Sequence, residues 1–478
     1  MRTAYSVESV RAAERELMGR LPEGALMQRA AAGLAVECAQ LLGKVYGARV
    51  TLLVGSGDNG GDALYAGARL ARRGAGVSAV LLAPERTHPG GLAALRAAGG
   101  VVVEADSARA EGLVAGARLV VDGIVGIGGR GGLRERAAQL VAAARDAVVV
   151  AVDLPSGVDA DTGEVHGDAV RADVTVTFGA YKPGLLVDPA REYAGAVRLV
   201  DIGLRLGAER GELEALQFAD VAGLLPVPGG ESDKYRRGVV GIVAGSARYP
   251  GAAVLAVAGA LRGGAGAVRY VGPAADAVIA RFPEALVSAG PPSKAGRVQA
   301  WVAGPGLGDD AERLGDVLAA DVPLLIDADG LRLAGEREVR ARQAPTLLTP
   351  HAGEAAALLG VAREQVEAGR LAAVRELAGR YGAAVLLKGS TTLVGSADGA
   401  VRVNPTGTSW LATAGSGDVL SGLAGSLLAA GLGARDAGSV AAHLHGLAGR
   451  FAADGAPVGA QDVADAIPAA WRGVRMPL

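Results

Sequence analysis

The sequence predicts an α/β protein built on parallel sheets and divided into two domains. Short, continuous apolar segments alternate with helical segments along the chain, a pattern typical of parallel strands that helices cover on both faces. The 478 residues are also too many for one ordinary hydrophobic core. A turn-rich segment at 225–230 interrupts the alternation, which then starts again. We therefore expect one domain over residues 1–215 and a second over 216–478.

The first domain is expected to open with two helices. Ser6 is a suitable N-cap for a helix that ends near Gly19, and a second helix is expected at about 25–42. Strands are then expected at 50–54, 77–82, 100–105, 118–126, 147–157, 173–180 and 195–203. This order predicts a doubly wound sheet that is Rossmann-like in the broad sense. The charged segment 207–216 is compatible with a helix.

The second domain repeats the alternation. Strands are expected at 238–245, 267–272, 299–308, 322–331, 344–354 and 383–395, with a hairpin-like strand at 399–404. An Ala-rich helix follows the first of these strands and ends near Arg262. The glycine-rich turn at 414–418 opens into an apolar helix, because the leucines that follow it recur at helical spacing.

Composition excludes several classes of protein. The net charge of −2 provides no electrostatic basis for nucleic-acid binding. The single cysteine, Cys38, excludes an internal disulfide and a cysteine metal site, and we expect it to be buried. The N-terminus lacks a basic region followed by an apolar core, and the apolar runs are short. We therefore expect no membrane contact and a cytoplasmic location.

Three loops with glycine and aspartate follow strands of the first domain. They are GSGDNGGD at 55–62, GIVGIGGRGG at 123–132 and DLPSG at 153–157. Because ligands bind beyond the carboxyl ends of parallel strands, we expect the three loops to form one site. Each Asp or Asn taken singly is about equally well explained as turn or capping chemistry, and the first loop is not the G-x-G-x-x-G fingerprint.

The second domain also places chemically capable residues after its strands. The alternatives are a turn or cap for Asp327 and Asp329, a surface loop position for His351, and ordinary solvation for Lys388. Asp418 belongs to the stretch Gly415-Ser416-Gly417-Asp418 at a helix start, where N–H groups favour an anion. An aspartate there is well placed to act as a base on a hydroxyl next to a phosphate, although a plain helix cap is the alternative.

Other common site types do not fit the sequence. His443 and His445 lie on different faces of an apolar helix, and we interpret them as structural rather than as zinc ligands. There is no G-x-S-x-G nucleophile elbow and no Walker A motif.

The three loops of the first domain together resemble the NAD(P)H-hydrate epimerase domain, over roughly residues 1–215. The resemblance implies that Asp153 is the acid/base that interconverts the two C6 epimers of hydrated nicotinamide, and that K⁺ is bound by Asn59, Asp122 and Ser156. It further implies a substrate site made of Asp58, Asn59, Gly60, Gly61, Asp62, Gly126, Ile127, Gly128, Gly129, Arg130, Gly131 and Gly132. Ile127 stands where the family commonly has threonine.

The second domain carries GSARYPGAA, GPGLG, DADGL, TPHAGE, LLKGS and GSGD in order. This series resembles the NAD(P)H-hydrate dehydratase branch of the ribokinase-like proteins, and it implies a ribokinase-like α/β fold with ADP and Mg²⁺. The implied contacts to the hydrate come from Ala253, Gly306, His351 and Asp418. The implied contacts to the nucleotide come from Lys388, Gly389, Ser390, Thr391, Thr392 and Gly417. Trp410 and Ala414 stand where the family usually has glycine.

Together the two resemblances imply a bifunctional enzyme that repairs hydrated NADH and NADPH (NADHX and NADPHX). The first domain would interconvert the R and S hydrates. The second would dehydrate the S hydrate with ADP, through Asp418 as the base, and release AMP and phosphate. We expect small-molecule substrates and a homo-oligomer. Two alternatives remain at this point: an ATP-dependent sugar or hydroxymethylpyrimidine kinase in the second domain, which the fused first domain disfavours, and a non-catalytic first domain, which Asp153 disfavours.

Overall fold

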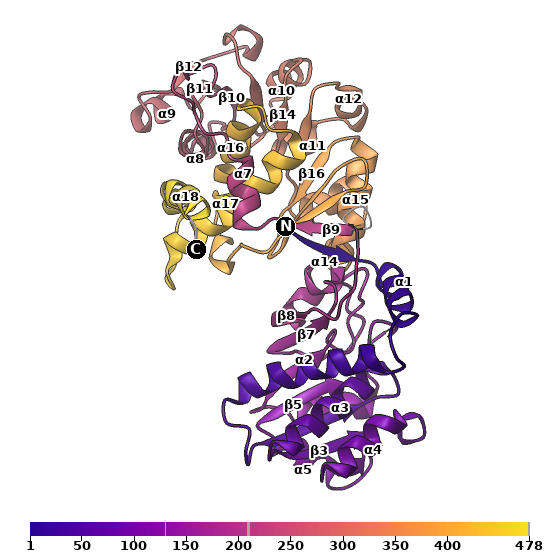
Figure 1. Ribbon diagram of the computed structural model, residues 1–478. Coiled ribbons are helices and arrows are strands. Elements are labelled where there is room, and N and C mark those ends of the chain that lie inside the picture. The colour runs from indigo at the N-terminus through magenta and orange to yellow at the C-terminus, as the bar shows by residue number, and fades with distance from the viewer. Residues whose placement is uncertain (130, 208–210, 477–478) are drawn as a thin grey trace. The chain divides into compact units, whose positions relative to one another are not determined.

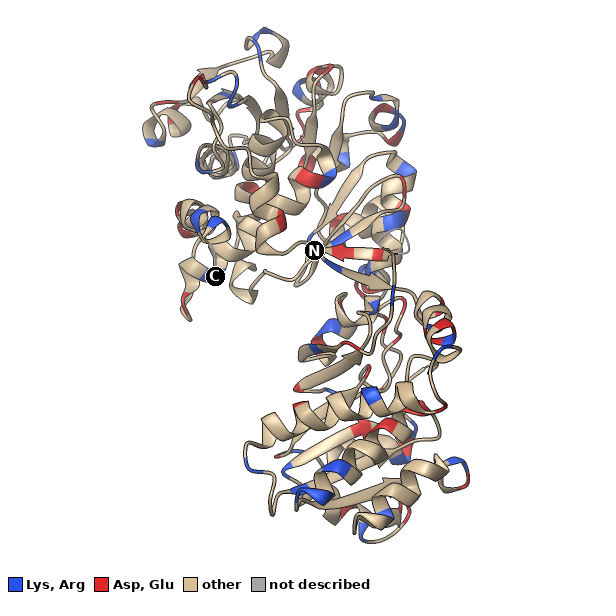
Figure 2. Cartoon of the chain, in the orientation of Figure 1, with Lys and Arg blue, Asp and Glu red and all other residues tan. Residues whose placement is uncertain are grey.

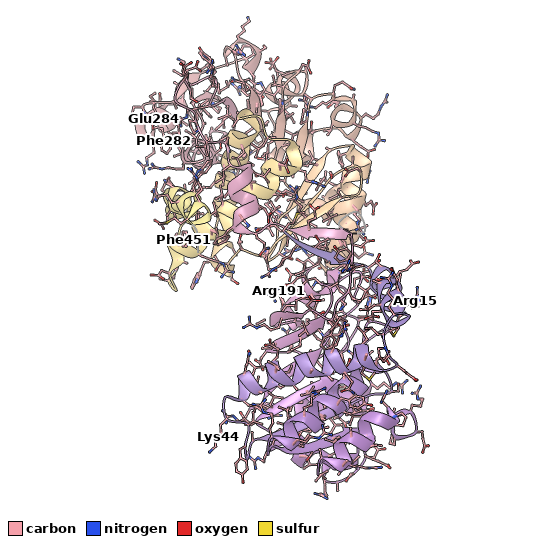
Figure 3. The ribbon with its side chains drawn as sticks, viewed as in Figure 1. Arg15, Lys44, Arg191, Phe282, Glu284 and Phe451 are labelled. Atoms are coloured by element: carbon pink, nitrogen blue, oxygen red, sulfur yellow. The ribbon has the colours of Figure 1, made fainter. Side chains whose placement is uncertain are left out.

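The computed structural model describes residues 1–129, 131–207 and 211–476 of the chain, so the predicted site residue Arg130 lies outside the described residues. The chain divides into two compact units (Figure 1). The N-terminal unit comprises residues 3–212, and the C-terminal unit comprises residues 1–2 and 213–478. Side chains fill the space between the sheet and the helices within each unit (Figure 3), and in the drawn view acidic and basic residues are interspersed on both (Figure 2).

Within the described residues, the N-terminal unit is built on a seven-stranded parallel sheet of order β4-β3-β2-β5-β6-β7-β8. The order reverses between β2 and β5, which is the switch point of a doubly wound sheet. The strands are β2 (Arg49–Val54), β3 (Gly76–Leu81), β4 (Val101–Glu104), β5 (Leu119–Gly123), β6 (Val148–Val152), β7 (Val174–Phe178) and β8 (Ala196–Val200). The helices are α1 (Val7–Met18), α2 (Ala25–Leu42), α3 (Asp58–Arg72), α4 (Pro89–Ala97), α5 (Ala110–Ala115) and α6 (Glu135–Ala142).

Alternate residues of the central strands enter different cores. Leu52 of β2 joins the cluster that contains residues of α2 and α3, while its neighbour Leu53 joins the cluster that contains residues of α5 and α6. Val121 and Val120 of β5 divide in the same way. Cys38 of α2 is fully buried in the first cluster. Both faces of the sheet are therefore covered, which explains why its strands are continuous apolar runs.

The second sheet in the described part of the chain is mixed and has eleven strands, of order β1-β9-β18-β17-β16-β15-β14-β13-β10-β11-β12, and strands β10 to β18 belong to the C-terminal unit. Neighbours from β16 to β12 are parallel, whereas β16, β17 and β18 pair antiparallel. The strands are β1 (Arg2–Tyr5), β9 (Gly211–Ala215), β10 (Val239–Val243), β11 (Ala267–Val271), β12 (Leu286–Ser288), β13 (Ala300–Ala303), β14 (Leu324–Ile326), β15 (Thr346–Leu348), β16 (Ala384–Leu387), β17 (Thr392–Gly395) and β18 (Val401–Asn404). The helices are α7 (Phe218–Leu224), α8 (Pro250–Arg262), α9 (Ala275–Arg281), α10 (Ala311–Leu318), α11 (Asp329–Leu333), α12 (Glu336–Ala341), α13 (Ala352–Leu359), α14 (Arg363–Ala368), α15 (Arg370–Tyr381), α16 (Ser416–Ala429), α17 (Ala434–Ala453) and α18 (Ala460–Arg475).

Helices α8 and α16 pack backbone to backbone through glycines. A Cβ built on Gly422 would lie 1.9 Å from the carbonyl oxygen of Ala256, and one built on Gly259 would lie 2.1 Å from that of Val419. No side chain larger than hydrogen fits at either position without a shift of the backbone. This contact holds the first turn of α16, and with it Asp418, in place.

Two expectations about secondary structure are wrong. Residues 211–215 form strand β9 rather than a helix, because Leu213 and Ala215 alternate with Glu212 and Glu214 and the segment pairs with β18. The segment 383–395 is two antiparallel strands, β16 and β17, rather than one. No helix in the described ranges is long and apolar enough to cross a bilayer.

Candidate active sites

The three loops of the N-terminal unit meet at one pocket of about 1050 Å³ at the carboxyl edge of the sheet. Its walls include the start of α3, the segment 124–129 after β5, and Asp153 after β6. Residues 58–62, expected in a loop, form the first turn of α3, with Gly57 as the N-cap. The pocket therefore contains backbone N–H groups of a helix start as well as side chains.

Asp153 and Lys182 form a buried ion pair in this unit. Asp153 is 6% exposed and Lys182 is 1% exposed, and the lysine Nζ donates to Asp153 Oδ1. The same carboxyl oxygen accepts from Thr177 Oγ1 at 2.9 Å and from the Phe178 N–H at 3.2 Å. The backbone of Asp153 has a φ of 67°, a left-handed conformation that is costly for a residue with a side chain. Three donors and an unusual backbone thus hold one carboxylate in a fixed position at the pocket wall.

Two further carboxyls of the pocket have raised pKa values. Asp62 is buried on α3, and desolvation, with added repulsion from Asp153, Asp58 and Glu14, raises its pKa well above the ordinary value. No hydrogen-bond partner of Asp62 Oδ1 is found among the described residues. Burial likewise raises the pKa of Glu14, with Lys182 acting in the opposite direction. The pocket therefore combines a lysine-paired carboxylate with two carboxyls whose pKa values are raised by burial.

Asn59, Asp122 and Ser156 lie together beneath this pocket. Ser156 donates to Asp122 through its hydroxyl at 2.6 Å and through its backbone N–H at 2.8 Å. Asn59 Nδ2 donates to the Val152 carbonyl, and a Cβ built on Gly126 would lie 2.5 Å from Asn59 Oδ1. Asp122 is 1% exposed, and burial raises its pKa to about 6 despite the hydrogen bonds from Ser156 and Ile124. Oxygen ligands around a buried carboxylate suit a hard cation.

The predicted site residues of the C-terminal unit meet at the carboxyl edge of its sheet. Lys388 follows β16, and its Nζ donates to Asp327 Oδ1 at 2.8 Å, with Glu354 Oε2 at 3.7 Å. Asp327 is 1% exposed, and its other oxygen accepts from Ser421 Oγ of α16 at 2.6 Å. The pair of charges is therefore tied to α16 by a hydrogen bond.

Asp418 lies in the first turn of α16, beside this pair. Burial raises its pKa to about 7, with Asp327 and Asp329 adding to the shift and Lys388 opposing it. The N-cap of α16, Gly415, has a φ of 87°, which favours glycine. His445 Nε2 lies 2.9 Å from the carbonyl oxygen of Ser416 and so contacts the same turn from α17. The aspartate therefore sits among helix N–H groups with a pKa close to neutrality.

The remaining predicted positions lie around this edge with different degrees of exposure. His351 is the N-cap of α13, and its Nδ1 accepts from the Gly353 and Glu354 N–H groups. Ala253 is fully buried on α8, so a direct contact with substrate would need a shift of its surroundings. Gly306 has a φ of 59°, and a Cβ there would lie 2.7 Å from that of Ala252.

The predicted nucleotide contacts surround the turn of the β16–β17 hairpin. Residues 388–391 link the two strands, and Gly389 and Ser390 are exposed. The guanidinium of Arg370 donates to the carbonyls of Lys388 at 3.0 Å and Thr391 at 3.1 Å, and it holds the turn from α15. A Cβ on Gly389 would lie 2.3 Å from that guanidinium, so a larger residue there would displace Arg370 from the turn.

Both histidines of α17 are buried, as expected of structural residues. Burial lowers the pKa values of His443 and His445 to about 4. The ring of His443 stacks edge-on against Phe218. Trp410, by contrast, is 42% exposed in the short helical turn at 409–411.

Sequence reasoning missed three residues that the structure brings into these sites: Lys182, Ser421 and Arg370. Lys182 and Arg370 lie in no motif, and Ser421 follows the GSGD stretch by three residues without being part of it. The apolar surroundings of Ser421 in α16 and the position of Lys182 just after β7 were the available signals, and neither distinguishes a site residue from an ordinary one.

The chain is similar to known proteins over both units. Residues 240–469 match the family described as NAD(P)H-hydrate dehydratase, and residues 23–184 match the family described as YjeF-related protein N-terminus. The bifunctional NAD(P)H-hydrate repair enzyme Nnr of Mycobacterium tuberculosis (strain CDC 1551 / Oshkosh) is 51% identical over 90% of this chain and 90% of its own. The enzyme of the same description from Mycobacterium leprae (strain TN) is 50% identical over 95% of this chain and 94% of its own.

Solved structures match the second half. The ADP/ATP-dependent NAD(P)H-hydrate dehydratase from Bacillus subtilis, co-crystallised with ATP and Mg²⁺, is 28% identical with a TM-score of 0.51, over 55% of this chain and 99% of its own. A ribokinase-like superfamily protein from Enterococcus faecalis V583, 24% identical with a TM-score of 0.51 over 56% of this chain and 98% of its own, has the same fold. The expected ribokinase-like fold is confirmed. The chain belongs to the family of bifunctional NAD(P)H-hydrate repair enzymes.

Proposed function

We propose that this protein repairs hydrated NADH and NADPH in two steps, epimerisation in the N-terminal unit and ADP-dependent dehydration in the C-terminal unit. The observation that carries the proposal is that each unit holds a buried, charge-paired aspartate cluster at the carboxyl edge of its sheet. Similarity to bifunctional repair enzymes over 90% or more of the chain supports the same pairing of activities. The cytoplasmic location and the homo-oligomeric state stay predictions.

In the N-terminal unit, Asp153 would take the proton of the C6 hydroxyl as the C6–N1 bond breaks, so that C6 becomes an aldehyde carbon and the bonding electrons go to N1. When N1 adds to the other face of that carbonyl, the C6–N1 bond re-forms and Asp153 returns the proton to the C6 oxygen. Its hydrogen bonds from Thr177 and Phe178 and its ion pair with Lys182 fix the carboxylate in the pocket wall. The first turn of α3 and the segment 124–129 would hold the hydrated ring in the pocket.

A potassium ion fits the oxygen atoms of Asn59, Asp122 and Ser156. The buried Asp122 carboxylate has only neutral hydrogen-bond donors in the described part of the chain, and a cation would offset its charge. Bound there, the ion would supply a fixed positive charge beneath the loops that contain Asp153 and Gly126. These residues would then keep the loops in register.

In the C-terminal unit, Asp418 would take the proton of the C6 hydroxyl of the S hydrate. The hydroxyl oxygen then attacks the terminal phosphorus of ADP, and AMP leaves. The C6–O bond breaks next, phosphate leaves, and loss of the C5 proton restores the C5–C6 double bond. Lys388 and the N–H groups at the start of α16 would stabilise the transferred phosphoryl group. Mg²⁺ bound with the nucleotide supplies further charge neutralisation.

The test is recovery of NADH from its hydrates. The full chain is incubated with a mixture of R and S hydrates, ADP and Mg²⁺, and NADH absorbance is followed. We expect complete recovery, because epimerisation feeds the S hydrate. Recovery of none would contradict the dehydratase activity. If NADH recovery ended at the amount of S hydrate initially present, after correction for spontaneous epimerisation, the result would contradict the epimerase activity.

A further inference from the structure

A second pocket, of about 470 Å³, lies at the carboxyl edge of the N-terminal sheet. Its walls come from the segments that follow β3 and β4, at 81–84 and 104–106, and from the start of α6 at 133–137. Parts of the loops after β5 and β6 complete them, including Gly131, Gly132 and the segment 155–158. These elements lie on the α5–α6 side of the unit, whereas the larger pocket is bounded by α2 and α3. The smaller pocket contains none of the residues assigned above to proton transfer or, apart from Ser156, to cation binding.

The two pockets meet at the switch point of the sheet. Both are lined by Ser56 after β2 and by Ile124, Val125 and Gly126 after β5. In doubly wound sheets, ligands bind in the crevice where the strand order reverses, and dinucleotides cross it. A molecule that extends from one pocket to the other would pass over these small loops.

The charges of the two pockets differ. Among the described residues, the larger pocket is lined by the carboxyls of Glu14, Glu23, Asp58, Asp62 and Asp153 and by a single arginine, Arg11. Dinucleotide phosphates would be repelled by the ionised members of that set.

The smaller pocket is lined by Arg86, Arg134 and Arg136 against Glu104 and Asp106. Arg136 forms an ion pair with Glu111, with 2.6 Å between the guanidinium nitrogen and the carboxylate oxygen. Arg86 and Arg134 form no ion pair with any described residue. Two exposed arginines without carboxylate partners suit the phosphates of a nucleotide.

We propose that the smaller pocket binds the adenosine monophosphate half of the hydrated dinucleotide, with Arg86 and Arg134 on the phosphate of that half and the hydrated nicotinamide beside Asp153. The inference rests on the proposed epimerase function. The ligand class is an adenosine nucleotide joined to the substrate ring, and the site is separate from the ADP site of the C-terminal unit.

Epimerisation of two substrates tests the proposal. Purified R hydrate of NADH is compared with R hydrate of reduced nicotinamide mononucleotide, which lacks the adenosine half. The full chain is incubated with each R hydrate in the absence of ADP, so that dehydration does not occur. Conversion of the R hydrate to the S hydrate is measured by chromatography of the reaction mixture. The variants are Arg86→Glu with Arg134→Glu, which reverses the charge, and Ala83→Trp, which fills the pocket. Arg145→Glu, an exposed charge reversal that lines neither pocket, is the control.

We expect both pocket variants to raise the KM for the NADH hydrate about tenfold or more. For the mononucleotide hydrate, both kcat and KM should be unchanged. The control should alter neither. Equal KM changes for both substrates, or no change for the NADH hydrate, would overturn the proposal. So would equal kcat/KM of the unaltered protein for the two hydrates. Failure of the unaltered protein to isomerise either hydrate would contradict the epimerase function instead.

Discussion

The pKa of Asp418 should set the acid limb of the dehydratase pH profile. Asp418 must be ionised to accept the C6 hydroxyl proton, and burial beside Asp327 and Asp329 raises its pKa to about 7. We therefore expect kcat/KM for the S hydrate to fall as the pH drops through about 7, rather than near 4 as for an ordinary aspartate. From the ionised fraction alone, the rate at pH 6 should be about one tenth of its plateau value.

The variant Asp329→Asn tests the cause of this shift. Asp329 raises the pKa of Asp418 through its negative charge, so its removal should move the acid limb to lower pH. In the unaltered protein, the Gly308 N–H donates to Asp329 Oδ2 at 2.8 Å, and the amide oxygen of an asparagine can still accept this hydrogen bond. The assay is NADH formation from purified S hydrate at saturating ADP and Mg²⁺ across pH 5 to 9, a range chosen to bracket the expected limb.

Asp418→Asn should lower kcat by about 10²–10⁴-fold, the usual contribution of a general base, and remove the limb. An unchanged limb in Asp329→Asn would show that Asp329 does not act on the titrating group. A limb near pH 7 that persists in Asp418→Asn would refute the assignment of the base.

Three further predictions concern the N-terminal unit and the core of the C-terminal unit. Lys182→Met should destabilise its unit by about 3–5 kcal/mol, because it leaves the buried Asp153 carboxylate without its cation. Circular dichroism melts and R-to-S conversion measure this, and an unaltered melt with normal conversion would contradict it. In the unaltered protein, the K⁺ effect is the melting temperature in K⁺ minus that in tetramethylammonium. Asp122→Asn should abolish any such rise in melting temperature. If K⁺ still raised the melting temperature of the variant, the ion would bind elsewhere. Gly422→Ala should lower the free energy of unfolding by about 2 kcal/mol, because its Cβ would lie 1.9 Å from the Ala256 carbonyl oxygen, and this loss is measured as a lower melting temperature. The matched control is Gly251→Ala on α8, where no atom lies within 4 Å of the added Cβ, and an equal effect of both changes would refute the packing argument.

The parallel strands could be predicted because a strand buried on both faces is a continuous apolar run. All seven strands of the N-terminal sheet were expected within a few residues of their bounds. Residues 211–215 were not, because Glu212 and Glu214 give this strand, which lies between β1 and β18, the charge pattern of a helix surface. The β16–β17 hairpin was read as one strand because both arms are apolar and the turn at 388–391 contains a single glycine.

The sequence by itself determined which loops follow which strands, and hence that Asp58, Asp122, Asp153, Asp327 and Asp418 lie at sheet edges. Local spacing carries that information because it records burial along one strand at a time. Only the tertiary structure decided that Lys182, 29 residues from Asp153, is buried against it, and that Asp327 and Asp329 shift the pKa of Asp418. Those interactions depend on distances between segments that are remote in the chain, and no periodicity within one segment encodes them.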